Sequence, residues 1–320
     1  MAAETEPVPG LPVLPPEWQP ESRTKDRVWL HLLLFALTIL STSLVGGGHY
    51  AGFQADFAAD APVPALHITS LLIDGLWYSV TILAILGCHE MGHYVACRRY
   101  DVDASLPFFL PAPLPLTGTL GAFIRIRSRI PSKVALFDIG VAGPIAGFVV
   151  AVPALFLGLH LSRVVPLPPD FEGMSLGEPL LFRAVSWLTF GEVADGMSVN
   201  MHPVAFAAWF GLLATALNLF PVGQLDGGHI AYAVLGRRST WVTFAMLAVA
   251  IGLAVVSSSW WVWTGLMVLM LFMVGPHHPP TLDDDTPLDP FRLALAVFAL
   301  IMLILCSTPA PIEPFVTGNL

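Results

Sequence analysis

The chain has few charged residues and few cysteines for its length. Only 12% of its 320 residues are charged, against about 25% in an average soluble domain. This shortage, together with a 55% hydrophobic composition, excludes an ordinary soluble protein and predicts an integral membrane protein. The three cysteines, Cys88, Cys97 and Cys306, lie in or beside apolar segments, which argues against a disulfide framework.

A basic surface with interleaved aromatic residues is also missing, so we expect no nucleic-acid partner. The formal charge is −9, and acidic residues gather outside the apolar segments, as in Asp283–Asp285. Residues 1–27 are rich in proline and glutamate and contain no apolar core, which predicts a disordered cytosolic tail and not a signal peptide. No internal repeat is visible.

Long apolar runs predict seven membrane crossings, with six as the alternative if the last runs are tilted or re-entrant. Trp260–Val274 is the shortest run. The predicted crossings are Val28–Val45, Leu71–Ala96, Val134–Leu161, Pro203–Phe220, Trp241–Val256, Trp260–Val274 and Phe291–Cys306.

The distribution of basic residues predicts the orientation. With a cytosolic N-terminus and seven alternating crossings, 12 of the 14 lysines and arginines fall on the cytosolic side, and only Arg163 and Arg183 fall outside. The C-terminus is then external. Both polar clusters described below lie at the cytosolic ends of their helices.

Two segments outside the crossings have predictable structure. Residues 104–131 are rich in proline and then alternate apolar with basic residues in Ala122–Ile130, which is typical of a strand. Leu180–Phe190 has polar residues three apart and suits an interfacial helix. The predicted fold class is therefore an all-α polytopic membrane protein of six to seven transmembrane helices with a small membrane-associated β-hairpin.

One apolar run ends in the sequence HEMGH, residues 89–93. His89 and His93 are four residues apart, so both imidazoles lie on one helical face and can reach a single metal ion. Glu90 projects beside that ion, which favours a general base over a structural carboxylate. Ionisable groups within a membrane are costly, and they normally mark a functional site facing water.

Two histidines leave a tetrahedral zinc site short of one protein ligand if a position is kept for water. Asp226, flanked by glycines at the cytosolic end of Pro203–Phe220, is the best third ligand, although aspartate also suits a helix cap before Gly228–Leu235. Cys97, four residues after His93, is the competitor. His229 either orients Asp226 or caps the turn.

Asn218 lies two helical turns before Asp226 in an apolar helix. Such an amide commonly packs by hydrogen bonding to a neighbouring helix. It could instead donate a hydrogen bond to a developing oxyanion, which we slightly favour. Pro221 breaks the helix and frees backbone groups that a cavity could solvate.

The HEMGH and NLFPVGQLDG segments, residues 89–93 and 218–227, together resemble the site-2 protease family of intramembrane zinc metallopeptidases. The segment HPPT, residues 278–281, followed by Asp289, resembles the subgroup of plant chloroplast and cyanobacterial homologues. The resemblance covers most of residues 71–292. Many bacterial members insert a PDZ domain between core helices, and no gap here is long enough for one, so substrate gating by a PDZ domain is not expected. The matching segments are residues 89–93 (HEMGH), 218–227 (NLFPVGQLDG), 118–124 (GTLGAFI), 137–148 (FDIGVAGPIAGF) and 278–281 (HPPT) followed by Asp289.

The resemblance implies an enzyme with one Zn²⁺ per chain, held by His89, His93 and Asp226. It implies that Glu90 is the general acid–base, with Asn218 assisting at the oxyanion. The expected reaction is hydrolysis of peptide bonds within or near a transmembrane segment of a membrane protein substrate, in contact with lipid. The substrate-binding residues implied by the hairpin motif are Gly118, Gly121, Phe123 and Ile124.

A transmembrane substrate helix hides its carbonyl groups, so it must unwind before cleavage. We hypothesise that the strand Phe123–Ile130 captures the unwound segment by strand addition. The alternative functions are a divalent-metal (zinc) transporter and a catalytically silent relative. We expect a membrane-embedded metalloprotease domain at 28–308, with its core at 71–235 and an external tail at 309–320. The expected location is the bacterial cytoplasmic membrane, with the active site near the cytosolic face.

Overall fold

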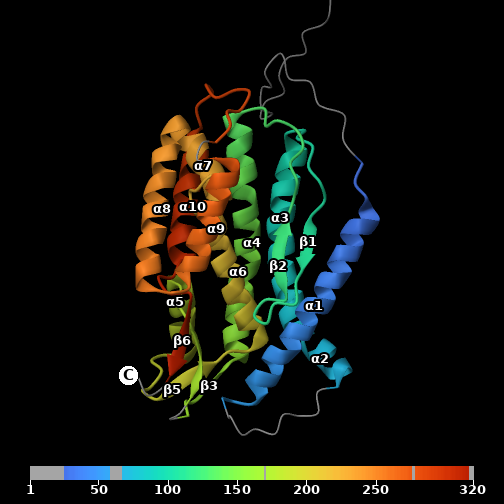
Figure 1. Ribbon diagram of the computed structural model, residues 1–320, viewed down its shortest axis with the longest axis vertical. Helices are drawn as coiled ribbons and strands as arrows, with labels where there is room; N and C mark the ends of the chain where they lie inside the picture. The colour runs from blue at the N-terminus through green and yellow to red at the C-terminus, as the bar shows by residue number, and fades with distance from the viewer. Residues whose placement is uncertain (1–24, 58–66, 169–170, 276–277, 317–320) are drawn as a thin grey trace, which may run out of the picture.

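The protein is a bundle of apolar helices with three small strand pairs at its periphery (Figure 1). The structure is a computed structural model, and it describes residues 25–57, 67–168, 171–275 and 278–316. The helices are α1 (Val28–Gln54), α2 (Ile68–Asp74), α3 (Leu76–Arg99), α4 (Lys133–Leu161), α5 (Leu180–Phe190), α6 (Pro203–Leu219), α7 (Asp226–Leu235), α8 (Ser239–Val256), α9 (Trp260–Val274) and α10 (Pro290–Cys306), with a short 3₁₀ turn, η1 (Gly236–Arg238), between α7 and α8.

Each strand pair is antiparallel. In the first, Phe108 pairs with Phe123 and Pro111 with Thr119, which gives the expected hairpin between α3 and α4. The pairs are β1 (Phe108–Pro111) with β2 (Thr119–Phe123), β3 (Arg163–Pro166) with β5 (Met197–Asn200), and β4 (Glu172–Leu176) with β6 (Ile312–Val316).

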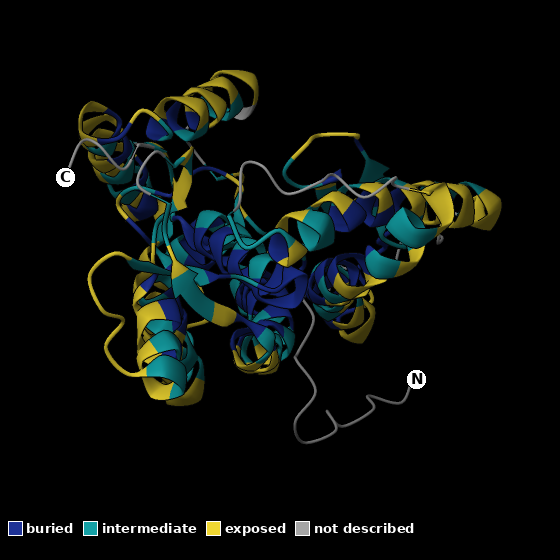
Figure 2. Cartoon of the chain, turned by 90° about the horizontal axis from the view of Figure 1, so that it is seen from below, coloured by how far each residue is buried: buried dark blue, intermediate teal, exposed yellow. Residues whose placement is uncertain are grey.

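Helix α4 lies at the centre of the bundle, between α3 and α6 (Figure 1). The Ser132 side chain caps it by accepting a hydrogen bond from the backbone N–H of Ala135 at 3.2 Å. Glycine and alanine recur along the buried side of α4, so the neighbouring helices approach closely. The dark core seen along the bundle in Figure 2 follows from this close packing.

Within the described residues, four helical segments are long and apolar enough to cross a membrane: α1, α3, α4 and the stretch from α7 through α8. Shorter apolar helices, among them α6 and α10, accompany them. Large apolar side chains such as Phe272, 90% exposed, cover the outer face, as expected for contact with lipid. The protein is therefore a mostly α-helical polytopic integral membrane protein, as the sequence predicts.

Two predicted elements differ from the structure. The predicted crossing Leu71–Ala96 is two helices, because α2 ends and α3 begins around Gly75, where α1 approaches so closely that a Cβ would lie 1.8 Å from the Ser43 carbonyl oxygen. The predicted strand Ala122–Ile130 is also wrong in its extent, since β2 occupies Thr119–Phe123.

Beyond Phe123 the pairing is reduced to an isolated bridge between Ala104 and Ile126. Side-chain hydroxyls interrupt the backbone ladder there, because the N–H of Arg125 donates to the Ser105 Oγ at 2.9 Å and that of Asp103 donates to the Ser128 Oγ at 2.9 Å. Two backbone hydrogen bonds remain in this stretch, from the Ser105 N–H to the Arg125 carbonyl at 3.0 Å and from the Arg127 N–H to the Asp103 carbonyl at 2.8 Å, so backbone and serine acceptors alternate there.

The helix predicted at Leu180–Phe190 is present as α5, with the bounds expected from the sequence, and its interfacial position stays a prediction. It lies at the same end of the bundle as the β3–β5 and β4–β6 pairs, whereas α7 and the α9–α10 connection lie at the opposite end (Figure 1). Part of the segment predicted as a C-terminal tail forms β6. The predicted tail at 1–27 lies almost entirely outside the described residues.

Candidate metal centre

Two helices bring the three predicted metal ligands together. Helix α3 carries His89 and His93, and α7 begins at Asp226. The Nε2 atoms of His89 and His93 lie 3.1 Å apart. One carboxylate oxygen of Asp226 lies 3.2 Å from the His89 Nε2, and the other lies 3.3 Å from the His93 Nε2. All three groups are largely shielded from solvent, with 14% of the Asp226 side chain exposed. Residues that are far apart in the sequence thus form one cluster.

The His93 ring is held by a backbone carbonyl on α4. Its Nδ1 lies 2.7 Å from the carbonyl oxygen of Ile139. A carbonyl oxygen can only accept, so Nδ1 carries the proton and donates it. In the neutral ring Nε2 then has a free lone pair directed at the cluster. A ligand histidine in a zinc site is typically oriented by this kind of contact.

Glycines on α4 make room for both rings. A Cβ at Gly143 would lie 2.1 Å from the His93 Nε2, and one at Gly147 would lie 3.2 Å from the His89 Cβ. On the α3 side, a Cβ at Gly92 would lie 2.5 Å from the Ala142 carbonyl oxygen. The packing of α3 on α4 therefore leaves no space for a side chain beside the histidines, which the motif alone did not reveal.

The donor set fits Zn²⁺. Two imidazole nitrogens and a carboxylate oxygen, all within 4.8 Å of one another, present lone pairs toward a common point, and such a set is stable only with a cation or protons between the atoms. Zinc accepts nitrogen and carboxylate ligands at tetrahedral positions, and three protein ligands leave a fourth position open, as catalytic sites require.

Glu90 and Asn218 border this cluster. The buried carboxylate of Glu90 lies in the field of His89, His93 and Asp226 and is hydrogen-bonded to the Ile124 backbone, just after β2. The Asn218 Nδ2 lies 3.4 Å from the His89 Nε2. The amide is therefore directed at the metal-ligand group rather than only at a neighbouring helix.

The predicted substrate-binding residues lie on the hairpin. Phe123 is 45% exposed on β2, and Gly121 has a φ of +99° with open space around it. Gly118 is at the hairpin tip, where its carbonyl accepts a hydrogen bond from the Ser41 hydroxyl at 2.7 Å. The hydroxyl of Tyr78 donates to the neighbouring carbonyl of Thr117 at 3.0 Å. The tip is thus anchored to α1 and α3.

The structure decides between several alternatives. Cys97 is fully buried in an apolar cluster with Ala135 and Ile139 and is not part of the metal-ligand group, so it is not the third ligand. Asp226 is not a helix cap, since α7 has Leu225 at the cap position and no side-chain cap hydrogen bond.

The hydrogen bond that the structure gives the His229 ring joins its Nδ1 to the His278 Nε2, at 2.7 Å, and does not involve Asp226. His278 also stacks on Tyr232, and its pKa is lowered because burial disfavours the charged ring. The Tyr232 hydroxyl donates to Asp284 at 2.7 Å. The α9–α10 connection is thereby tied to α7, the helix that carries Asp226. From the sequence, the role of His277, His278 and Asp283–Asp285 is open, and a solvated cytosolic loop is the favoured interpretation. His277 lies outside the described residues.

A buried group of two imidazoles and a carboxylate inside a bundle of apolar helices defines an integral membrane protein with a metal centre. Residues 77–259 match the family model for Peptidase family M50, which covers more than half of the chain. The chain therefore belongs to peptidase family M50, the site-2 protease family that the motifs resemble.

Similar curated proteins come from plants. The chain is 30% identical over 254 residues to the Arabidopsis thaliana protein named "Probable zinc metalloprotease EGY2, chloroplastic", with 78% of this chain and 44% of the relative covered. It is 34% identical over 233 residues to "Probable zinc metalloprotease EGY1, chloroplastic" of the same plant, covering 71% and 42%. The rice (Oryza sativa subsp. japonica) protein of the latter name is 29% identical over 313 residues, covering 91% and 52%.

The chain thus spans about half the length of the curated relatives it matches. No solved structure matches it. The relatives are chloroplastic by name, so the bacterial cytoplasmic membrane expected from the sequence stays a prediction, as does the orientation.

Proposed function

We propose that this protein is a zinc metalloprotease that hydrolyses peptide bonds within or near transmembrane segments of membrane protein substrates. The observation that carries the proposal is the convergence of His89, His93 and Asp226, with Glu90 beside them, inside a bundle of membrane helices. Family membership and the names of the plant relatives support the same chemistry. We assign the catalytic unit to residues 28–308, with its core at 71–235.

In this proposal His89, His93 and Asp226 would hold one Zn²⁺, which would supply a Lewis acid and lower the pKa of water near neutral pH. The Glu90 carboxylate takes a proton from the attacking water and passes it to the leaving amine nitrogen. Its hydrogen bond to the Ile124 backbone orients it toward the end of β2. The Asn218 Nδ2 donates to the developing oxyanion.

The substrate must present an extended segment, because a membrane helix keeps its carbonyl groups bonded internally. Strand β2 is paired on one side only, with β1, so an unwound segment can add to it. Leu120 and Phe123 on β2 are 68% and 45% exposed and offer apolar contacts to such a segment. Because Ile124 reaches Glu90, a segment on β2 lies close to the general base.

Metal transport is the competing function. A transport path needs polar ligand groups at successive depths in the membrane. In the part of the chain that the structure describes, the one group of three or more metal-ligating side chains is His89, His93 and Asp226. A single such group among the described residues, with no second one along the helices, favours hydrolysis.

Glu90→Gln is the decisive variant. Because Glu90 is not a ligand in this proposal, the purified variant should retain zinc at the wild-type stoichiometry while cleavage of a single-pass membrane substrate in proteoliposomes falls at least about a hundredfold. Glu192→Gln, an exposed glutamate at the opposite end, is the matched control and should keep both properties.

Equal cleavage by Glu90→Gln and wild type would remove Glu90 from the mechanism. Zinc uptake into sealed vesicles by wild-type protein without cleavage would establish transport instead.

A further inference from the structure

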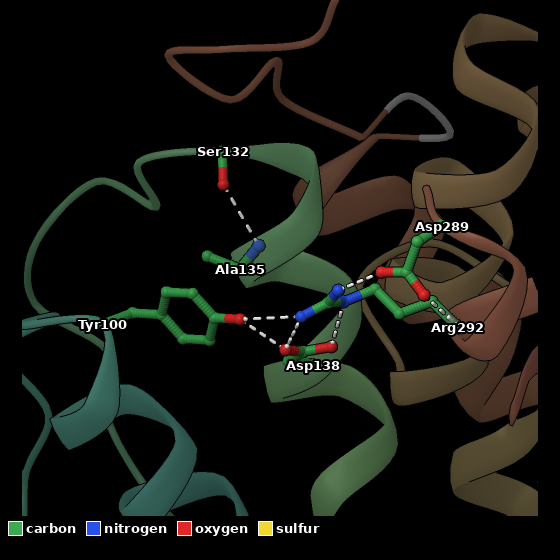
Figure 3. Close-up of polar contacts among 6 residues, drawn as sticks. All are labelled: Tyr100, Ser132, Ala135, Asp138, Asp289 and Arg292. Atoms are coloured by element: carbon green, nitrogen blue, oxygen red, sulfur yellow. Dashed lines mark hydrogen bonds and ion pairs between the residues drawn. The ribbon is translucent and has the colours of Figure 1, made fainter. Parts of the chain in front are cut away.

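A second polar cluster joins the end of α3 to α4 and α10 (Figure 3). Arg292, in the first turn of α10, donates through Nε and Nη2 to the two carboxylate oxygens of Asp138 on α4, at 2.7 and 2.6 Å. It also donates to Asp289, which in turn caps α10 by accepting from the Arg292 backbone N–H at 3.0 Å. We call Tyr100, Asp138, Asp289 and Arg292 the Arg292 cluster.

Tyr100, directly after α3, completes the cluster. The Tyr100 hydroxyl donates to Asp138, and the Arg292 Nη2 donates to the Tyr100 hydroxyl oxygen at 3.3 Å. Burial, with the hydrogen bond to Asp138, raises the pKa of Tyr100 to about 12, so the hydroxyl keeps its proton at physiological pH. The ring is 3% exposed, which fixes the position of the hydroxyl. The C-terminal end of α3 is thereby held on α4 and α10.

The Arg292 cluster and the metal-ligand group both lie where α3 packs on α4. Tyr100, the residue after α3, follows His93 by seven residues and His89 by eleven, so by the helical spacing its side chain continues the face that carries both histidines. That face packs on α4, where Asp138 immediately precedes Ile139, the residue whose carbonyl accepts from His93. The orientation of one metal ligand and the bidentate ion pair therefore involve consecutive residues of α4.

We propose that Arg292 is a positioning residue, which through Asp138 and Tyr100 fixes the register of α3 on α4 and so aims the His93 ring at the metal. This inference rests on the proposed zinc site. It adds a role for α10, which contributes no ligand, and for a charged group that the catalytic scheme does not use.

The geometry leaves little tolerance for a shift of α3 along α4. The His93 Nδ1 is 2.7 Å from its carbonyl partner, and the opposite side of the ring faces Gly143 with no space for a methyl group. Apolar contacts between the helices resist separation but fix sliding only weakly, whereas a planar guanidinium bound to both oxygens of a carboxylate defines one position. Lysine offers a single point charge and cannot reproduce this geometry.

The test measures zinc binding by the purified full-length chain in detergent, by competition with a chelator. Arg292→Met and Tyr100→Phe should weaken zinc affinity about tenfold to a hundredfold, the range typical for the loss of groups that orient ligands. Arg292→Lys should restore part of the loss seen in Arg292→Met. With Co²⁺ in place of zinc, the visible absorption bands of the variants should shift, because these bands report the arrangement of the ligands.

Arg183→Met is the matched control. Arg183 also faces a carboxylate, Glu178 at 3.7 Å, but on α5 at the opposite end of the bundle. It should leave zinc affinity and the cobalt spectrum unchanged. If Arg292→Met fails to fold, Tyr100→Phe and Arg292→Lys decide the question, since each retains most of the packing.

A purely structural role would lower the thermal stability of the variants while the folded protein bound zinc with wild-type affinity, and this result would overturn the proposal. The proposed protease function fails separately, if wild-type protein binds zinc but cleaves no membrane substrate. In that case the change in zinc affinity still tests the role of Arg292.

Discussion

At the scale of single residues, the metal-ligand group depends on a glycine, Gly143, whose lack of a side chain leaves room for His93. Gly143 faces the His93 ring so closely that a Cβ would lie 2.1 Å from Nε2, and the histidine cannot retreat because Ile139 holds its other nitrogen. Close packing of this kind transmits small changes of volume directly to the neighbouring group. Gly143→Ala should therefore weaken zinc affinity at least about tenfold, measured by chelator competition.

Gly252→Ala is the control for that substitution, because Gly252 lies in another apolar helix, α8, where a Cβ would meet no atom within 4 Å. Its zinc affinity should equal that of wild type. Equal affinities in both variants would mean that the His93 ring has more freedom than its contacts indicate.

At the scale of elements, the β1–β2 hairpin is positioned by its tip. Gly118 has a φ of +67°, and a Cβ there would lie 2.8 Å from the Cα of Thr42 on α1. Gly118→Ala combines left-handed strain, about 1–2 kcal/mol, with a clash against backbone, and so should release the tip from α1. Since the hairpin holds no metal ligand, zinc content should stay at the wild-type level while cleavage of a single-pass membrane substrate falls about tenfold.

Gly236→Ala separates strain from clash in that experiment. Gly236 also has a positive φ, +59°, but open space surrounds it in η1, away from the hairpin. Cleavage should be little changed. If both substitutions reduced cleavage equally, strain alone would explain the effect and docking of the hairpin tip on α1 would not matter.

At the scale of the whole molecule, arginines lie at both ends of the helix bundle. Arg163 and Arg183 lie at the end that carries the β3–β5 pair and α5, whereas Arg237, Arg238 and Arg292 belong to the opposite end (Figure 1). The positive-inside rule then predicts that the second end faces the cytosol.

Labelling with a membrane-impermeant thiol reagent tests this orientation in sealed cells. Glu192→Cys, in an exposed loop after α5, should be labelled directly, and Asp285→Cys, in the α9–α10 connection, should react only after permeabilisation. The native Cys97 and Cys306 are buried, whereas Cys88 is partly exposed, so the chain without an added cysteine is labelled in parallel to measure the background. The reverse pattern would invert the proposed topology.

Much of the site could be predicted from the sequence, because its chemistry is local. The four-residue spacing of His89 and His93 places both rings on one face of any helix, and Asp226, followed by two glycines after a second apolar segment, was the best third ligand. The apolar runs likewise predicted most helices within a few residues. The exclusion of Cys97 and the extent of β2 could not be predicted, since both depend on which distant groups fill the space and take the hydrogen bonds.

The sequence by itself determined that this chain enters a membrane and carries two imidazoles and a carboxylate suited to zinc, because composition and helical period act over short distances. Only the tertiary structure decided how α3 sits on α4, which carbonyl orients His93, and that Arg292 joins Asp138 and Tyr100 beside them. Those contacts join residues up to 192 positions apart, and packing in three dimensions is what brings them within hydrogen-bonding distance.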